Sequence, residues 1–314
     1  MRFLTRVKRV ISAIRDPLSY QLLWYALAKR GFSPPQRDSG LAEISIDERA
    51  AGQTSIPRVI FHTWKSNDDL SANYHYWRES FVLKNPGYKL IFWGHLENRN
   101  FVRDRFSWFL PNYTSYPDEV FRANIIRILF SYVYGGFCAH MDSECLRPLD
   151  GLRGMGDILL GRMGRDDGFE HSLPNAVMIS KAKQGFWLLA LAFAIERLAQ
   201  AAEQTDPSRL RPEWLTGAIL VKDAAEFYQG HSKNEVLKRI SNASADLASE
   251  AANSDFGAIS ISPATVWCPI NWNNFLQTVA RRNMFRNKLV VAEGDTRSLF
   301  PQAYIVTYWS EPWD

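Results

Sequence analysis

Residues 117–142 read PDEVFRANIIRILFSYVYGGFCAHMD, and this stretch decides the fold class. Pro117 and the two acids after it suit the first turn of a helix, and apolar residues then recur at the spacing of one helical face. The glycine pair at 135–136 suits the C-terminal stop of that helix. The short apolar run 137–141 that follows is typical of a buried strand. The stretch therefore predicts a helix, a turn and a strand that leads to Asp142.

Strands and helices alternate along the rest of the chain, which indicates an α/β fold with a mostly parallel sheet. Further strands are predicted at 57–64, 88–93, 157–163, 175–180, 257–262 and 303–309, and further helices at 185–203, 213–228 and 232–241. The apolar stretch of the first of these helices is shorter than the roughly 20 residues that a membrane span needs. Ligands of such sheets bind beyond the carboxyl ends of the strands, so we expect Asp142 to lie in a ligand site.

Charge is distributed unevenly along the 314 residues, whose formal net charge is +4. Residues 1–37 hold eight Lys and Arg against one acid, a net charge of +7, which leaves −3 for the remainder. A protein that binds nucleic acid through its folded body would carry a basic face on that body. The composition therefore argues against a nucleic-acid partner and separates a basic arm from a mildly acidic domain.

The basic arm has apolar residues on one predicted helical face, with Lys and Arg between them. Such a helix can lie on an anionic membrane through residues 1–30, or it can simply pack on the domain. A polar, Pro- and Gly-rich linker follows at 31–40. We therefore expect two parts, an amphipathic arm with its linker at 1–40 and a catalytic domain at 41–314.

Three cysteines without CxxC spacing suggest neither a zinc site nor a disulfide framework, and a reducing compartment is the simpler expectation. Together with the arm, this predicts a cytoplasmic protein peripheral to the inner face of a membrane, or a lumenal one in a eukaryote.

The acidic residues after the strand at 137–141 suggest metal chemistry. His140 and Asp142 are i and i+2, so on a strand their side chains point the same way, and Glu144 continues that spacing. A carboxylate at this place can hold Mn²⁺ or Mg²⁺, which neutralises the diphosphate of a nucleotide-sugar. The alternative for an isolated H-x-D triplet is a solvated loop acid beside a hydrogen-bonded histidine.

An ordered set of motifs resembles the DXD-containing glycosyltransferases with a sugar-binding region, which include yeast-type initiating mannosyltransferases, animal α-1,4-galactosyltransferases and bacterial capsule enzymes. The matching segments are IPRVI and TWK within 56–65, NPGY at 85–88, RANIIR at 122–127, YGGF at 134–137, Asp142, LD at 149–150, NA at 175–176, LTG at 215–217 and the terminal Tyr304, Trp309 and Trp313. The resemblance covers about residues 56–313 in the correct order.

The resemblance implies a GT-A fold, retention of anomeric configuration and a site built from these motifs. Trp64 would line the nucleobase pocket, where an aromatic face stacks on the base. Arg127 would contact the donor near its sugar and phosphate, and Asp142 would be the direct metal ligand, with Glu144 as a possible second carboxylate. The C-terminal segment with Ser310 and Trp313 would close over the diphosphate.

Five positions depart from the family pattern, and at two of them an acid is replaced; the other three are Phe61, Ala218 and the place of the C-terminal histidine at Thr307 or Tyr308. His140 stands at the first acid of DXD, and Asn124 stands at the helix aspartate of D-x-x-R. Asn124 can hydrogen-bond a sugar hydroxyl as a catalytic-site residue, and neutral His140 can do the same or bind a transition metal. Asn175 fits the family's N-A strand, and we expect it to contribute to nucleotide-sugar binding.

The function expected from this resemblance is transfer of a hexose from a UDP- or GDP-sugar to a glycan or glycolipid acceptor in cell-surface polysaccharide synthesis. The alternative is a non-catalytic GT-A domain that binds nucleotide-sugar or glycan, or that scaffolds an active partner; His140 and Asn124 favour this alternative. A different enzyme is unsupported, because the sequence lacks a G-x-S-x-G elbow, a P-loop and a dinucleotide-binding glycine turn after a strand.

Overall fold

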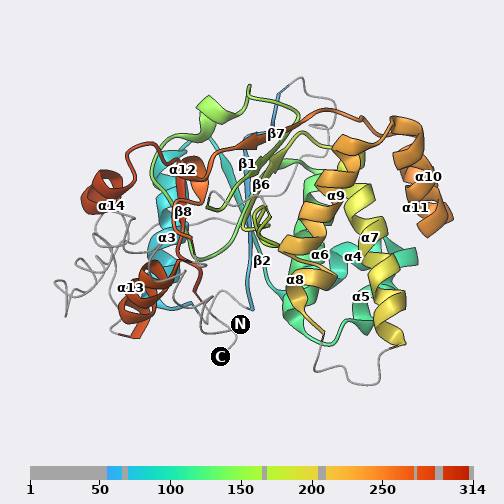
Figure 1. The fold of residues 1–314 in the computed structure, drawn as a ribbon, viewed down its shortest axis with the longest axis horizontal. Coiled ribbons are helices and arrows are strands. Elements are labelled where there is room, and N and C mark those ends of the chain that lie inside the picture. Colours follow the sequence, from blue (N-terminus) through green and yellow to red (C-terminus); the bar gives the residue numbers. More distant parts are fainter. Residues whose placement is uncertain are drawn as a thin grey trace.

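The computed structural model describes residues 55–65, 70–164, 168–203, 210–271, 274–286 and 293–310. The predicted arm and linker at 1–40 and the predicted site residue Trp313 lie outside the described residues. In Figure 1 the central sheet runs between a group of helices that includes α6, α7 and α9 and a group that includes α3, α12 and α13. The α/β fold expected from the sequence is therefore confirmed.

The central sheet has six strands in the order β2-β1-β3-β6-β5-β7. Their bounds are β1 Val59–Thr63, β2 Lys89–Trp93, β3 Gly136–Ala139, β5 Ile158–Gly161, β6 Val177–Ser180 and β7 Ile259–Ser262. β1 is parallel to β2 and to β3, and β5 is parallel to β7. β6 is antiparallel to both of its neighbours, so the other five strands share one direction. The predicted mostly parallel sheet is confirmed, and the arrangement is consistent with GT-A.

A separate two-stranded ribbon joins β4, Ser143–Cys145, to β8, Ile305–Thr307, in antiparallel register. The strand predicted at 303–309 therefore exists, but it pairs outside the central sheet. The pairing continues past the ribbon, where the Tyr308 amide donates to the Asp142 carbonyl at 2.9 Å. The ribbon brings the C-terminal part of the chain to the end of β3.

Helices cover both faces of the sheet. One group has the bounds α4 His95–Arg105, α5 Leu110–Ser115, α6 Glu119–Val133, α7 Gly185–Ala202, α8 Pro212–Leu215, α9 Ala218–Gly230, α10 Lys233–Ala243 and α11 Ala245–Ala251. The other has the bounds α3 Ala72–Lys84, α12 Ala264–Trp267, α13 Phe275–Arg286 and α14 Glu293–Leu299. Two short 3₁₀ helices lie at Ser107–Phe109 and Leu149–Leu152.

The single helix predicted at 213–228 is two helices. Thr216 and Gly217 separate α8 from α9, because Gly217 has ψ near −139°, which is not helical. A β-carbon at Gly217 would lie 2.9 Å from the Cα of Glu213, so only glycine fits this turn. The break places the start of α9 beside the cavity described below.

Side chains of the strands alternate between two cores. Cys138, Leu160 and Met178 belong to the cluster that contains α6 and α7, whereas Phe137 and Leu159 pack on the other side with α3 and α12. Successive side chains of a strand point to opposite faces of the sheet, and here both faces are covered. The strands are therefore continuous apolar runs in the sequence.

The predicted glycine turn between α6 and β3 is confirmed. Gly135 and Gly136 have φ of 64° and 88°, a region that non-glycine residues rarely adopt. A β-carbon at Gly136 would lie 2.5 Å from the Val59 carbonyl oxygen. Glycine is therefore required here for both backbone conformation and close strand packing.

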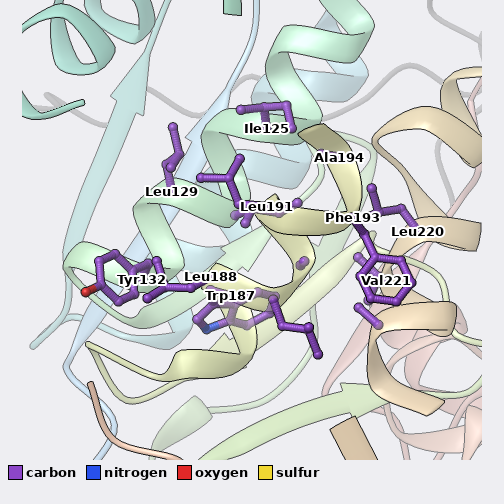
Figure 2. Packing of buried hydrophobic residues seen from close by; sticks show 14 of the residues in the cluster. Ile125, Leu129, Tyr132, Trp187, Leu188, Leu191, Phe193, Ala194, Leu220 and Val221 are labelled. Carbon is purple, nitrogen blue, oxygen red and sulfur yellow. The ribbon is translucent and has the colours of Figure 1, made fainter. Parts of the chain in front are cut away.

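Helix α7 is long and apolar enough to cross a membrane by length and composition, but 67% of its most apolar window is buried within the fold. Figure 2 shows its side chains Leu188 and Leu191 directed toward Ile125 and Leu129 of α6. The Trp187 indole also donates to the Ser180 hydroxyl on β6 at 2.8 Å. These contacts make α7 a core helix of this domain.

We predict that Leu188→Ala lowers the free energy of unfolding by about 2–5 kcal/mol, because it removes a fully buried side chain and leaves a cavity. Urea denaturation of the purified protein measures this. Leu96→Ala on α4 is the control, since that side chain is 67% exposed, and it is expected to cost less than about 0.5 kcal/mol. Equal small effects of the two substitutions would contradict the placement of α7 in the core.

Candidate active site

A cavity of about 440 Å³ opens at the carboxyl ends of β1 and β3. Thr63 and Trp64 line it from the end of β1, and residues 139–142 line it from the end of β3. Asn175 reaches the same edge although it precedes its strand, because β6 is antiparallel and begins where β3 ends. Asp142 therefore lies at the carboxyl-end edge of the sheet, as expected, and lines the cavity.

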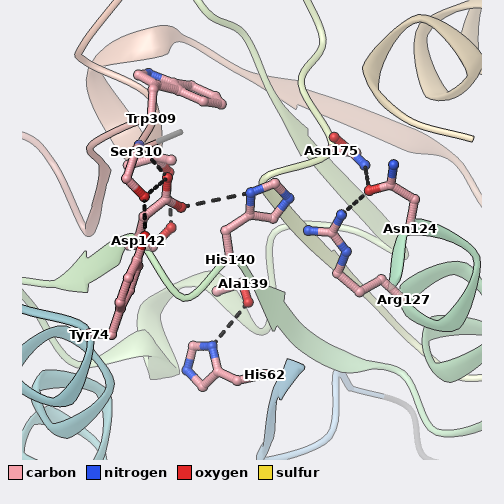
Figure 3. Close-up of polar contacts among 12 residues, drawn as sticks. His62, Tyr74, Asn124, Arg127, Ala139, His140, Asp142, Asn175, Trp309 and Ser310 are labelled. Atoms are coloured by element: carbon pink, nitrogen blue, oxygen red, sulfur yellow. Dashed lines mark hydrogen bonds and ion pairs between the residues drawn. The ribbon is translucent and has the colours of Figure 1, made fainter. Parts of the chain in front are cut away.

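The buried carboxylate of Asp142 is held by the C-terminal segment. Its Oδ2 accepts hydrogen bonds from the Ser310 amide at 2.8 Å and from the Ser310 hydroxyl at 3.2 Å (Figure 3). Its Oδ1 lies 3.7 Å from His140 Nδ1, which is an ion-pair distance if the imidazole is protonated. Burial raises the pKa of Asp142 above its ordinary value, and the bonds from Ser310 oppose that shift. The structure therefore brings Asp142, His140 and Ser310 together.

Tyr74 of α3 connects the C-terminal segment to the predicted base-binding residue. Its hydroxyl shares a hydrogen bond of 2.7 Å with the Ser310 hydroxyl, and burial raises its pKa to about 12. Its ring lies 4.6 Å from that of Trp64, at a tilt of 43°. Trp64 thus lines the cavity, and the ring of Tyr74 packs against it. Stacking on a nucleobase stays a prediction.

Trp309 precedes Ser310 in a left-handed backbone conformation, with φ of 53°. Its indole donates to the Ile270 carbonyl at 2.6 Å, and Arg281 of α13 donates to the Trp309 carbonyl. These two contacts fix the unusual backbone that turns the Ser310 amide toward Asp142.

Arg127 and Asn124 of α6 form a second polar group in the cavity wall. The Asn124 Oδ1 accepts from the Arg127 guanidinium and from the Asn175 side chain at 3.0 Å, and its Nδ2 donates to the Thr216 hydroxyl at 3.1 Å. Figure 3 shows these three side chains across the cavity from Asp142. The structure therefore gathers the predicted residues Asn124, Arg127 and Asn175.

Arg127 is only 5% exposed, and its guanidinium donates to the amide oxygen of Asn124 rather than to a carboxylate. Burial lowers its pKa to about 10, so the guanidinium is still charged at neutral pH. Arg127 does not pair with Glu119 of the same helix. Glu119 pairs instead with Arg122, at 2.7 Å.

The predicted metal ligand Glu144 is not part of the site. It is 1% exposed and accepts hydrogen bonds from the Tyr308 hydroxyl at 2.5 Å and the Tyr76 hydroxyl at 3.5 Å. The prediction assumed a continuous strand from 140 to 144. Instead residues 141–142 form a turn, in which the Ser143 amide donates to the His140 carbonyl at 3.2 Å. The turn breaks the i, i+2 relation, and β4 carries Glu144 into the ribbon.

Three residues of the site region were missed from the sequence. His62 is fully buried on β1, with Nδ1 3.0 Å from the Ala139 carbonyl oxygen, and burial lowers its pKa to about 4, so it is a neutral link between β1 and β3. Tyr74 and Arg281 come from helices α3 and α13, which were not predicted. A basic residue on an amphipathic helix gives no local sign that it faces a cavity.

One family model matches part of this chain. Residues 71–158 match the model described as "Glycosyltransferase sugar-binding region containing DXD motif". That range contains α3, α6 and Asp142. Residues 71–158 are therefore similar to the sugar-binding region of the DXD-type glycosyltransferases, as the motif pattern indicated.

The relatives with assigned names are fungal. The chain is 29% identical over 188 residues to inositol phosphoceramide mannosyltransferase 2 of Schizosaccharomyces pombe, a match that covers 55% of this chain and 53% of that protein. It is 34% identical over 110 residues to inositol phosphoceramide mannosyltransferase 3 of the same organism. That match covers 35% of this chain and 30% of that protein. Mannosyl phosphorylinositol ceramide synthase CSH1 of Saccharomyces cerevisiae is 32% identical over 97 residues, covering 31% and 26%. The chain thus spans about half or less of the length of these relatives.

Among solved structures, the PaToxG glycosyltransferase aligns over 96% of this chain and 99% of that one, with a TM-score of 0.41 and 14% sequence identity.

We predict that Asp142→Asn raises the stability of the ligand-free protein at pH 7. The pKa of Asp142 is raised on folding by burial, so its ionised form opposes folding, and that cost decreases as the pH falls through the raised pKa and disappears below 3.8, where the carboxyl is protonated in both states. The measurement is urea denaturation at pH 7 and pH 4, and the advantage of the variant is expected at pH 7 and reduced at pH 4.

Asp157→Asn is the control of opposite sign. Its hydrogen bond from Lys181 lowers the pKa of Asp157, so the ionised form favours folding and the loss should be largest at pH 7. If Asp142→Asn had a lower free energy of unfolding than the wild type at pH 7, that result would contradict the conclusion that burial of the ionised Asp142 opposes folding.

Proposed function

We propose that this chain is a glycosyltransferase that moves a hexose from a UDP- or GDP-sugar to a glycolipid acceptor. The observation that carries the proposal is the cavity between Arg127 and Asp142, two buried charged groups at the ligand-binding edge of the sheet. A buried cation without a carboxylate at its side chain is stabilised by an anionic ligand. The DXD-type region that contains both residues supports a nucleotide-sugar as that ligand.

The names of the relatives support a more specific proposal for the donor sugar and the acceptor. They are named as inositol phosphoceramide mannosyltransferases. Mannose is accordingly our proposed sugar, and a phosphoinositol-containing lipid is our proposed acceptor. Retention of the anomeric configuration is proposed from the family resemblance, as is a place in the synthesis of cell-surface glycans.

In the proposed reaction, the bond between the anomeric carbon and the β-phosphate oxygen breaks, and its electron pair stays with the nucleoside diphosphate. The acceptor hydroxyl oxygen forms the new bond to the anomeric carbon, and its proton passes to the departing β-phosphate oxygen. Arg127 would stabilise the negative charge that develops on the departing diphosphate. The Asn124 and Asn175 amides would hydrogen-bond sugar hydroxyls, and Trp64 would stack on the base.

The part of the cavity beside Asn124 and Asn175 is left for the acceptor. Pro174, Pro212, Glu213 and His171 line it, and burial lowers the pKa of His171 below its ordinary value. This wall adjoins the start of α9 at Gly217. An acceptor hydroxyl that entered here would meet the donor sugar beside Asn124 and Asn175.

Membrane association is proposed from the sequence of residues 1–30, which would bring the domain to a lipid acceptor. We propose the cytoplasmic face of the membrane for a bacterial protein and a lumenal face for a eukaryotic one.

A second candidate function is binding of a nucleotide-sugar without transfer. The observation that favours it is the replacement of two family acids by Asn124 and His140, both of which line the cavity. Donor binding without any transfer product would establish this candidate.

We predict that Arg127→Gln lowers the transfer rate by about 10²–10³-fold, because it removes a charged donor aimed at the developing diphosphate. The assay measures radiolabelled hexose transferred from GDP-mannose, and from UDP-hexoses, to inositol phosphoceramide in detergent micelles. Arg122→Gln is the matched control, since Arg122 lies on the same helix, pairs with Glu119 and does not line the cavity.

Wild-type turnover by Arg127→Gln would contradict the proposed role of Arg127. Circular dichroism of both variants checks that each is folded before its rate is compared.

A further inference from the structure

One end of the cavity is formed by residues from three places in the chain. Trp64 follows β1, His95 begins α4 shortly after β2, and Asp118 precedes α6, and all three line the cavity. The Trp64 amide donates to the carbonyl of Trp93, the last residue of β2, at 3.2 Å. His95 Nδ1 lies 3.7 Å from a carboxylate oxygen of Glu119, the residue next to Asp118. These contacts place Trp64, His95 and Asp118 together, and we call this part of the cavity the Trp64 end.

The Trp64 end is connected to the segment that is expected to cover the diphosphate. Tyr74 makes the connection, because its ring lies 4.6 Å from that of Trp64 and its hydroxyl shares a 2.7 Å hydrogen bond with the Ser310 hydroxyl. Figure 3 shows Tyr74 directed toward Ser310 and Asp142. A nucleotide whose base stacked on Trp64 would therefore have its phosphates toward Ser310, and the edge of its base would face the remaining walls of the Trp64 end.

Stacking on Trp64 does not select a base, because every nucleobase has a π face. Selection requires a hydrogen-bonding group in the plane of the base. Among the described residues that line the Trp64 end, the carboxylate is that of Asp118. The other acids of the described lining lie elsewhere, since Asp142 is bonded by Ser310 and Glu213 belongs to α8. Asp118 is therefore the acidic group that can contact the base.

The carboxylate of Asp118 is not used by its own helix. Asp118 is the N-cap residue of α6, but its side chain makes no capping hydrogen bond, and the residue is exposed. A carboxylate is an acceptor with two oxygens, so it suits two donors that lie side by side. Guanine has such a pair on one edge, the N1–H and the 2-amino group. Uracil instead presents one N3–H between two carbonyl oxygens, and a carboxylate repels both of those oxygens.

We propose that Asp118 recognises the base of the donor, and that this base is guanine, stacked on Trp64 with its N1–H and 2-amino group donating to the Asp118 carboxylate. This inference rests on the proposed function, since it names the donor base of the same site. It makes Asp118 a specificity-determining residue that the sequence motifs do not include.

The test is isothermal titration of the purified protein with GDP, inosine diphosphate (IDP) and UDP in a buffer that contains Mn²⁺. IDP differs from GDP only in lacking the 2-amino group, so contacts to the ribose, the phosphates and a metal cancel in that comparison. The wild type is expected to bind GDP about tenfold or more tightly than IDP or UDP, because a site that hydrogen-bonds a ligand group rejects an analogue without it.

Asp118→Ser is expected to reduce the GDP-to-IDP affinity ratio to less than about threefold, because both carboxylate oxygens are removed. Serine is also a preferred N-cap residue, so α6 is expected to keep its first turn. Asp104→Ser is the matched control, since Asp104 is an exposed acid on α4 that does not line the cavity. It is expected to leave the ratio unchanged.

Equal affinity of the wild type for GDP and IDP, or an affinity for UDP that matches or exceeds that for GDP, would overturn the inference and leave the donor site intact. An unchanged GDP-to-IDP ratio in Asp118→Ser would overturn the role of Asp118. Failure of all three nucleotides to bind would instead remove the proposed function, and the inference with it.

Discussion

The rest of the site depends on two hydrogen bonds that Ser310 donates to the buried carboxylate of Asp142. They join the end of β3 to a segment that is far away in the sequence. The antiparallel ribbon of β4 and β8 places that segment, and Trp309 turns it with a left-handed backbone that its indole and carbonyl contacts stabilise. Because a buried carboxylate needs hydrogen-bond donors, Asp142 and the C-terminal segment each keep the other in place.

The charge distribution of the cavity reflects two positions at which the family pattern has an acid and this chain has Asn124 or His140. Where the family resemblance calls for an acid on α6, Asn124 offers an amide oxygen to Arg127, and the arginine keeps an unbalanced charge inside the fold. His140 stands at the other acidic position, and Glu144, which could have replaced it, bonds two tyrosines. Both changes therefore reduce the number of carboxylates at this end of the cavity.

The fold was largely predictable where the signal is local. The helix α6, the glycine turn and the strand that follows it came from periodicity and from the two glycines, and the six central strands lie within or next to their predicted ranges. The split of 213–228 into α8 and α9 was missed, because the apolar pattern continues across Thr216 and Gly217. The end of the strand at His140 was also missed, and with it the true direction of Glu144. A turn of two residues is too short to change the apolar periodicity of the sequence, so periodicity does not reveal it.

The sequence by itself determined the α/β class, the two-sided burial of the sheet and the place of Asp142 at one edge of it. Those properties follow from the spacing of apolar residues and from the shared direction of parallel strands, both of which are local or geometric rules. The motif resemblance added Arg127 and Asn124 to the expected site. The tertiary structure alone decided that Ser310 bonds Asp142, that Arg281 joins the cavity and that Glu144 leaves it. These outcomes depend on contacts between segments that are distant along the chain, and no local pattern of residues specifies which distant groups will meet.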